Sequence, residues 1–222
     1  MADQRVINVL FHGVGTPRRE LERGEDRYWV TLDRFHSILD ELTTLAQVRI
    51  SFDDGNASDA EIALPALLER GLRADFFVLA GRLGTPGSLD ADAVRELAVN
   101  GMGIGSHGMR HQSWRGMDAN TRHDELVAAR ERLCEVLGAE VDAAACPMGR
   151  YDRRVLTVLR ALGYRRVFTS DRRPARRSAW LQPRYSVLRD DTAATIRDLV
   201  LSRPPLPRRI RSAAASLVKS WR

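Results

Sequence analysis

The sequence has few cysteines, few aromatic residues and no long apolar run. Of its 222 residues only two are cysteines, Cys134 and Cys146, and they do not form a Cys-x-x-Cys pair. Two cysteines are too few for a disulfide framework, and their scarcity fits a reducing compartment. The segment that begins at Met1 lacks the long apolar run of a signal peptide or a membrane span. We therefore expect a cytoplasmic protein.

The charge of the chain is basic and unevenly distributed. A formal net charge of +6 and a pI near 10.1 favour an anionic partner or surface. Aromatic residues make up 6% of the chain and are not interleaved with the basic clusters, as binding of single-stranded nucleic acid would require. We therefore expect no nucleic acid partner and interpret the clusters as a solvated face. They contain Arg172, Arg173, Arg176 and Arg177, then Arg203, Arg208, Arg209, Arg211, Lys219 and Arg222.

Strand and helix patterns alternate through most of the chain. With 44% hydrophobic residues, a chain of this size can bury the core of one compact α/β domain. The repeated β-α units predict a parallel sheet or a barrel slightly smaller than eightfold, with functional groups at the carboxyl ends of its strands. Expected strands cover 6–11, 48–52, 75–79, a stretch around 104, 143–146, 166–169 and 184–188. Expected helices cover 32–42, a stretch from 58 or 65 to 70, 90–100, 124–137, 153–162 and 192–202.

We divide the chain into a domain of residues 1–202 and a C-terminal segment of residues 203–222. The segment starts with a proline-rich break and continues with apolar residues at helical spacing beside basic ones. This pattern predicts an amphipathic helix. The helix would pack on the domain or, in a second hypothesis, rest on an anionic membrane surface.

Two adjacent carboxylates, Asp53 and Asp54, stand at the end of the strand expected at 48–52. Apolar and polar residues alternate along that strand, and a Gly-Asn turn signal follows the pair. Neighbours in a regular strand point to opposite faces, so the two carboxylates can share a site only where the pleat breaks. One of them could then bind a metal while the other stays free as a base. The alternative is a solvated Asp-Asp-Gly turn.

Two histidines, His107 and His111, follow another expected strand at the spacing of one helical turn. At that spacing both imidazoles can face one ion, although the pair alone is a weak signal and surface histidines are the alternative. Combined with a carboxylate from another strand end, the pair predicts a site of two histidines and one carboxylate. Such a site leaves coordination positions open for water and substrate, which indicates catalysis.

Four segments follow one another at suitable spacing: Ser51–Gly55, Ala74–Val78, Gly105–His107 with His111, and Pro147–Tyr151. In this order they resemble the motifs of the polysaccharide deacetylases, the NodB-homology family of carbohydrate esterases. The resemblance extends from about Val6 to Leu199. It implies a distorted (β/α)7 barrel with one divalent metal, usually zinc and otherwise cobalt, nickel or iron. The implied activity removes acetyl groups from N-acetylated sugars.

The resemblance also assigns roles to residues. Asp54, His107 and His111 would be the metal ligands, and Asp53 would be the base that takes a proton from the attacking water. The oxyanion would be stabilised by the metal and by the backbone N–H of Met148. Substrate binding would involve Pro147, Met148, Gly149, Tyr151 and Trp114. Tyr151 and Trp114 could stack on a sugar ring, or they could be packing aromatics.

The chain departs from the family pattern at the proton donor. The usual donor is a histidine near the C-terminus, but no histidine follows His123. By elimination the donor is His12, at the end of the first expected strand. A Phe-His segment there resembles a permuted subgroup of the family that includes poly-N-acetylglucosamine deacetylases. The alternative is a histidine that only caps the strand turn.

A second departure concerns the arginine that orients the base. The segment before Pro147 lacks this arginine, so another residue would hold Asp53, and Arg150 and Arg184 are equal candidates.

Three functions remain as hypotheses. The first is a metal-dependent N-deacetylase acting on a GlcNAc-type sugar or glycan precursor. The second keeps the barrel and the metal but hydrolyses another small amide or an imide. The third is a catalytically silent domain that binds an anionic glycan or a membrane through its arginines.

Overall fold

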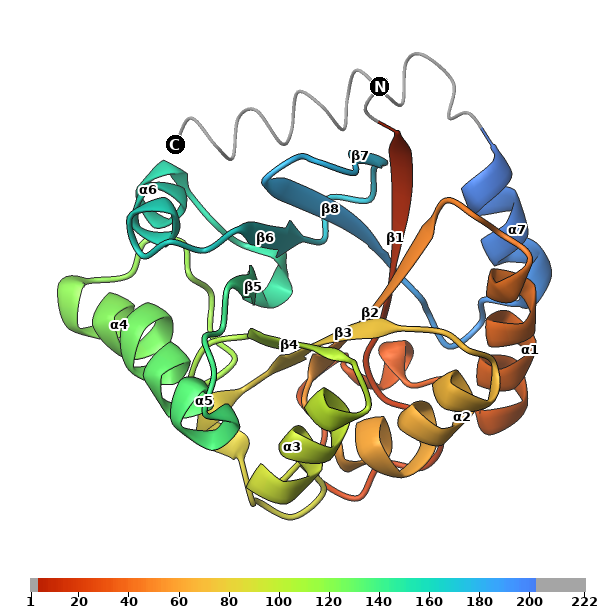
Figure 1. Ribbon diagram of the computed structural model, residues 1–222, viewed down its shortest axis with the longest axis horizontal. Helices are drawn as coiled ribbons and strands as arrows, with labels where there is room; N and C mark the ends of the chain where they lie inside the picture. The colour runs from red at the N-terminus through yellow and green to blue at the C-terminus, as the bar shows by residue number, and fades with distance from the viewer. Residues whose placement is uncertain (1–3, 203–222) are drawn as a thin grey trace.

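The structure is a ring of parallel strands surrounded by helices, as the computed structural model in Figure 1 shows. It describes residues 4–202. The ring contains β1 (Arg5–Phe11), β2 (Val48–Asp54), β3 (Ala74–Val78), β4 (Gly103–Ser106), β5 (Ala143–Ala145), β6 (Arg166–Thr169) and β8 (Leu181–Ser186). Their order is β2-β3-β4-β5-β6-β8-β1, and the pairing of β1 with β2 closes the ring. The predicted fold, a single α/β domain with a seven-stranded parallel barrel, is confirmed.

Helices cover the outside of the barrel (Figure 1). They are α1 (Leu32–Thr43), α2 (Leu64–Glu69), α3 (Ala91–Val99), α4 (Ala119–His123), α5 (Ala129–Leu137), α6 (Arg153–Ala161) and α7 (Ala193–Leu201). A short strand, β7 (Ala175–Arg176), pairs antiparallel with the first residues of β1. None of the helices within residues 4–202 has the length and apolar character needed to cross a membrane.

Helix α1 shows how apolar spacing sets the packing. Thr31 caps its first turn by accepting a hydrogen bond from the backbone N–H of Arg34. One face of the helix then packs on the barrel, because its apolar residues recur every three or four positions. The buried residues of this face are Phe35, Ile38, Leu39 and Leu42.

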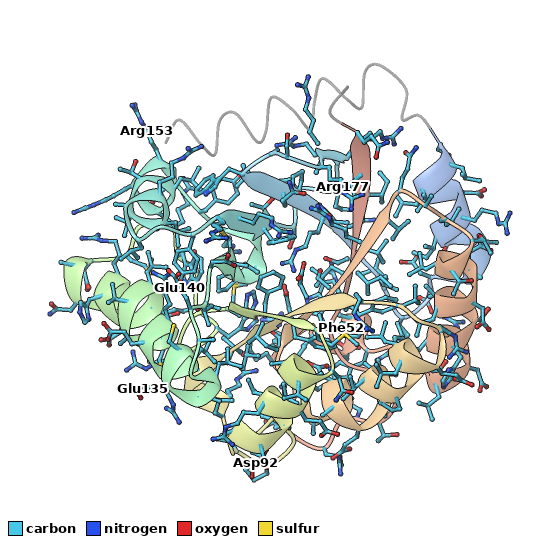
Figure 2. The ribbon with its side chains drawn as sticks, viewed as in Figure 1. Phe52, Asp92, Glu135, Glu140, Arg153 and Arg177 are labelled. Carbon is cyan, nitrogen blue, oxygen red and sulfur yellow. The ribbon has the colours of Figure 1, made fainter. Side chains whose placement is uncertain are left out.

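The two faces of the strands carry different residues. The rings of Phe11, Phe52 and Phe76 stack across β1, β2 and β3, and they belong to the core between the strands and the helices. Figure 2 shows Phe52 near the centre of the molecule. Side chains alternate along a strand, so the residue that follows each of these phenylalanines faces the interior of the barrel. Phe77 accordingly packs in a separate small cluster with Phe168, and Asp53 faces the same interior.

The structure settles one local prediction and corrects another. The helix expected to start at 58 or 65 begins with a π-helical turn, Asp59–Ala63, and the Ser58 hydroxyl accepts a hydrogen bond from the N–H of Val14 rather than from that turn. The last barrel strand covers Leu181–Ser186 rather than 184–188. It includes Pro183, whose carbonyl accepts from the side chain of Asn8. The predicted linker and helix at 203–222 lie outside the described residues.

Candidate active site

The carboxylate pair lies at the carboxyl end of β2, where the pleat breaks. Asp53 continues the extended strand, but Asp54 has a φ of +79°, in the left-handed region that residues with a side chain rarely adopt. The break lets both carboxylates reach one site, as the sequence predicted. Both side chains are buried. Backbone strain of this kind is typical of positions that function requires.

Arg184 holds Asp53 with a two-pronged ion pair inside the barrel. Its Nη1 and Nη2 each lie 2.7 Å from one carboxylate oxygen of Asp53. The guanidinium is fully buried and lies 5.1 Å from the ring centre of Phe77 and 5.7 Å from that of Phe168. Of the two candidate arginines, the structure therefore places Arg184 on Asp53, whereas Arg150 is exposed.

This contact sets the charge of Asp53. Burial acts to raise the pKa of the Asp53 carboxyl, but the charge and hydrogen bonds of Arg184, together with the charges of His107 and His12, outweigh burial and lower it. Asp53 is consequently ionised at neutral pH and able to accept a proton.

The three predicted metal ligands converge. One ligand atom from each of Asp54, His107 and His111 lies within 4.8 Å of the others. Nε2 of His107 and Nε2 of His111 lie 3.6 and 3.5 Å from Oδ1 of Asp54. The two histidines belong to the loop after β4 rather than to a helix, and His111 has a φ of +48°. The prediction that the two histidines lie on one helical turn is therefore wrong. Both rings nevertheless face Oδ1 of Asp54.

The donor set fits a divalent cation. Neither carboxylate oxygen of Asp54 has a hydrogen-bond partner within residues 4–202, although both are shielded from solvent. Burial acts to raise the pKa of Asp54, but three neighbouring histidines and Arg82 outweigh it and lower the pKa to about 2. A buried ionised carboxylate without a donor is costly, and a bound cation would remove that cost. Two imidazoles and one carboxylate are suitable ligands for zinc and similar metals.

The hydrogen bond of Nδ1 of His107 leaves Nε2 as the nitrogen that can bind a metal. Nδ1 lies 2.9 Å from the carbonyl oxygen of Ala145 on β5, which accepts a hydrogen bond only if Nδ1 carries the proton. Burial lowers the pKa of His107, against the opposing charges of Asp53 and Asp54. The neutral ring therefore presents an unprotonated Nε2 toward Asp54, as metal binding requires.

A buried glutamate that the sequence analysis missed anchors the histidine loop. Glu125 accepts hydrogen bonds from the backbone N–H groups of Met109 and Arg110 at 2.9 and 3.1 Å, and also from the side chains of Gln112 and Trp114. At Gly108, φ is +85° and a Cβ would lie 2.2 Å from Oε2 of Glu125. One sequence signal was available: Glu125 shares helical spacing with the buried residues of α5, so it is a charge on an apolar face.

His12 lies at the carboxyl end of β1, next to the carboxylate pair. The register pairs the preceding residue, Phe11, with Phe52, so His12 adjoins Asp53. Its ring stacks on Tyr28, with centroids 4.6 Å apart. Burial lowers the pKa of His12, while the charges of Asp54 and Asp53 oppose that shift. Its buried Nδ1 has no hydrogen-bond partner in the described part of the chain.

The segment after β5 contains the predicted oxyanion and substrate residues. Met148 has a φ of +56° and is half exposed, whereas Pro147 and Gly149 are buried. Tyr151 is buried and its hydroxyl donates to Asp171 at 2.8 Å. Trp114 is fully buried, so it has no face left for a sugar ring. The packing alternative therefore describes both Trp114 and Tyr151, and Met148 is the residue of this set that is open to a ligand.

A further buried acid lies close to the carboxylate pair. Asp59 is 1% exposed. Burial and then the charges of Asp54 and Asp53 raise its pKa well above the usual range. Asp59 therefore holds its proton more readily than an ordinary aspartate. No sequence pattern marks this acid as buried, because an aspartate after a turn is normally solvated.

Comparisons with known proteins identify relatives of the chain. The family model for polysaccharide deacetylases matches residues 43–167, which is more than half of the chain. YxkH of Bacillus subtilis (strain 168), named as a polysaccharide deacetylase, is 25% identical over 124 residues, which cover 56% of this chain and 44% of YxkH. The match therefore spans less than half of that relative.

Solved structures share the fold. The deacetylase PplD of Streptococcus pyogenes, in complex with acetate, has a TM-score of 0.78 at 18% identity, covering 90% of this chain and 100% of PplD. IcaB from Ammonifex degensii has a TM-score of 0.74 at 21% identity, covering 89% and 97%. A de-N-acetylase from Aggregatibacter actinomycetemcomitans has a TM-score of 0.75 at 15% identity, covering 88% and 100%. With the family model matched over most of the barrel, the chain belongs to the polysaccharide deacetylase family.

Proposed function

We propose that the protein is a metal-dependent N-deacetylase that acts on a GlcNAc-type sugar or glycan precursor. The observation that carries this proposal is the convergence of Asp54, His107 and His111 beside an ionised Asp53. The family supports an acetylated sugar as the substrate. A divalent metal held by the three ligands would supply Lewis acidity toward water and the acetamide carbonyl.

The protein's own groups divide the remaining work. Asp53, held ionised by Arg184, takes the proton of the attacking water. The backbone N–H of Met148 donates to the oxyanion that develops on the acetamide carbonyl. His12, on the neighbouring strand, gives a proton to the departing amine, because an amine leaves readily only when it is protonated. Acetate and the free amino sugar result.

The first test compares metal-free and reconstituted protein on N-acetylated oligosaccharides and on lipid-linked GlcNAc. We expect acetate release only after one equivalent of Zn²⁺, Co²⁺ or Ni²⁺ is restored, because the ligand set leaves positions open. The control is Asp54→Ala, which should neither bind metal nor release acetate. If the protein binds metal but releases ammonia from amides or ring-opened product from imides, the substrate is an amide or imide instead of an acetylated sugar. If it binds no metal, the catalytically silent domain is the better hypothesis.

The C-terminal segment supports a separate proposal about location. We propose that residues 203–222, with their basic and apolar residues, bring the protein to an anionic membrane surface. Deletion of residues 204–222 should then reduce cosedimentation with vesicles that contain phosphatidylglycerol, and added salt should reduce the binding of the full chain. Equal binding by both proteins would contradict this proposal. The cytoplasmic location stays a prediction.

A further inference from the structure

The loop between β1 and α1, residues 12–31, brings a carboxylate to the outer edge of the candidate metal centre. Oε2 of Glu22 lies 2.8 Å from Nδ1 of His111. Oε1 of Glu22 accepts a hydrogen bond from Arg82. The exposed fractions are 39% for the Glu22 side chain and 13% for the His111 side chain. The Glu22 carboxylate therefore contacts both His111, a predicted metal ligand, and the guanidinium of Arg82.

Contacts also connect Glu22 to the loop that follows Asp54. Its backbone N–H donates to Oε2 of Glu25 at 2.8 Å, and the Glu25 carboxylate is nearly buried. Nη1 of Arg19 donates to the same oxygen at 3.0 Å. Arg19 also donates from Nη2 to Oδ1 of Asn56 at 2.9 Å. Since Asn56 is two residues from Asp54, this chain of contacts fixes Glu22 relative to another metal ligand.

Arg82 connects Glu22 to the histidine loop by a second route. Arg82 ends the 3-10 turn Ala80–Arg82, which follows β3. Within that turn, the N–H of Gly81 donates to the carbonyl of Met109 at 3.0 Å. Met109 lies between the two predicted metal-binding histidines. Glu22 and His111 are thus held at a fixed separation from two sides.

We propose that Glu22 is the positioning residue for His111, an inference that rests on the metal site of the proposed function. A carboxylate at Nδ1 keeps the proton on that nitrogen and directs the lone pair of Nε2 toward Asp54, 3.5 Å away. His111 also has a left-handed backbone, with a φ of +48°, and a strained conformation of this kind persists only where surrounding contacts hold it. The Ala145 carbonyl gives His107 the equivalent support.

The test is a Zn²⁺ titration of the metal-free full chain in competition with a chromophoric chelator. Glu22→Ala should raise the Kd for Zn²⁺ about 10- to 100-fold, the usual effect of removing a partner of this kind. Glu22→Gln, which keeps an acceptor but loses the charge, should fall between Glu22→Ala and the unsubstituted protein. The matched control is Glu20→Ala, an exposed glutamate of the same loop, which should leave the Kd unchanged.

A second measurement separates positioning from general destabilisation. In ¹⁵N spectra of the metal-free protein, His111 should show its proton on Nδ1, and Glu22→Ala should shift the ring toward a mixture of tautomers while His107 stays unchanged. Unchanged Zn²⁺ affinity and tautomer in Glu22→Ala would overturn the role of Glu22 and leave the metal site intact. Failure of the unsubstituted protein to bind Zn²⁺ would overturn both.

Discussion

Replacing Arg184 with methionine should destabilise the fold and impair catalysis more than any other change to an arginine of the described chain. The substitution leaves the carboxylate of Asp53 buried without its two hydrogen bonds. Removing one member of a buried pair costs about 3–5 kcal/mol in the free energy of unfolding. Urea denaturation of the variant and of the unsubstituted protein would measure this loss.

The pH dependence of that loss follows from the charge of Asp53. Arg184 keeps the folded-state pKa of Asp53 low, so the pair stabilises the protein above the unfolded pKa of aspartate, and this stabilisation fades as pH falls through the folded pKa. In Arg184→Met, burial should raise the folded-state pKa of Asp53 above its unfolded value. The variant should then lose free energy of unfolding as pH rises through this range. The difference in the free energy of unfolding between the unsubstituted protein and Arg184→Met should therefore become smaller toward pH 4. The acidic limb of the activity profile should move to higher pH in the variant.

Two further variants make the test of Arg184 specific. Arg150→Met removes the exposed alternative arginine and should change neither stability nor the pH profile. Combining Arg184→Met with Asp53→Asn should restore part of the lost stability, because the unpaired buried charge disappears. Stability of Arg184→Met equal to that of Arg150→Met would contradict the role of the ion pair.

Substitution of His12 by alanine should lower kcat about 10²- to 10⁴-fold, the usual contribution of a positioned acid. The Kd for Zn²⁺ should stay the same, since His12 is not among the converging ligand atoms. Acetate release under saturating substrate would measure the first quantity, and chelator competition the second. Substrates with a more acidic leaving amine should lose less activity in the variant, because their departure needs less protonation.

The matched control for His12 is His123→Ala, at the exposed end of α4, which should be nearly as active as the unsubstituted protein. Near-normal turnover of His12→Ala would leave this histidine with a capping role in the strand turn and would reopen the search for a proton donor.

The fold and the centre of the site could be predicted because both depend on local patterns. Strand and helix periods alternate along the chain, and the carboxyl ends of parallel strands meet at one end of a barrel. That geometry brings Asp54 to His107 even though 52 other residues separate them in the sequence. The break of the pleat at Asp54 was predictable for the same reason, since two adjacent carboxylates can share a site only there.

The partners of these residues could be predicted only in part, with Arg184 as one of two candidates for Asp53, because they depend on exact strand limits and long-range contacts. A last strand at 184–188 would place Arg184 at its amino end, whereas the observed strand, Leu181–Ser186, places it near the carboxyl end beside Asp53. Glu22 and His111 are 89 positions apart, and no local pattern connects them. Glu125 was missed since one acid within a helix is normally on the solvated face.

The closure of the barrel also predicts an order in which the site assembles during folding. β1 lies between β8 and β2. Both edges of this first strand are therefore paired only after the last barrel strand, β8, has joined the sheet. Arg184 arrives with β8, which means that Asp53 gains its partner only when this final, most distant pairing forms. Contacts of such long sequence separation form late because they carry a large loop-closure entropy. A growing or partly folded chain therefore contains both catalytic carboxylates well before it contains the cation that makes one of them a defined base.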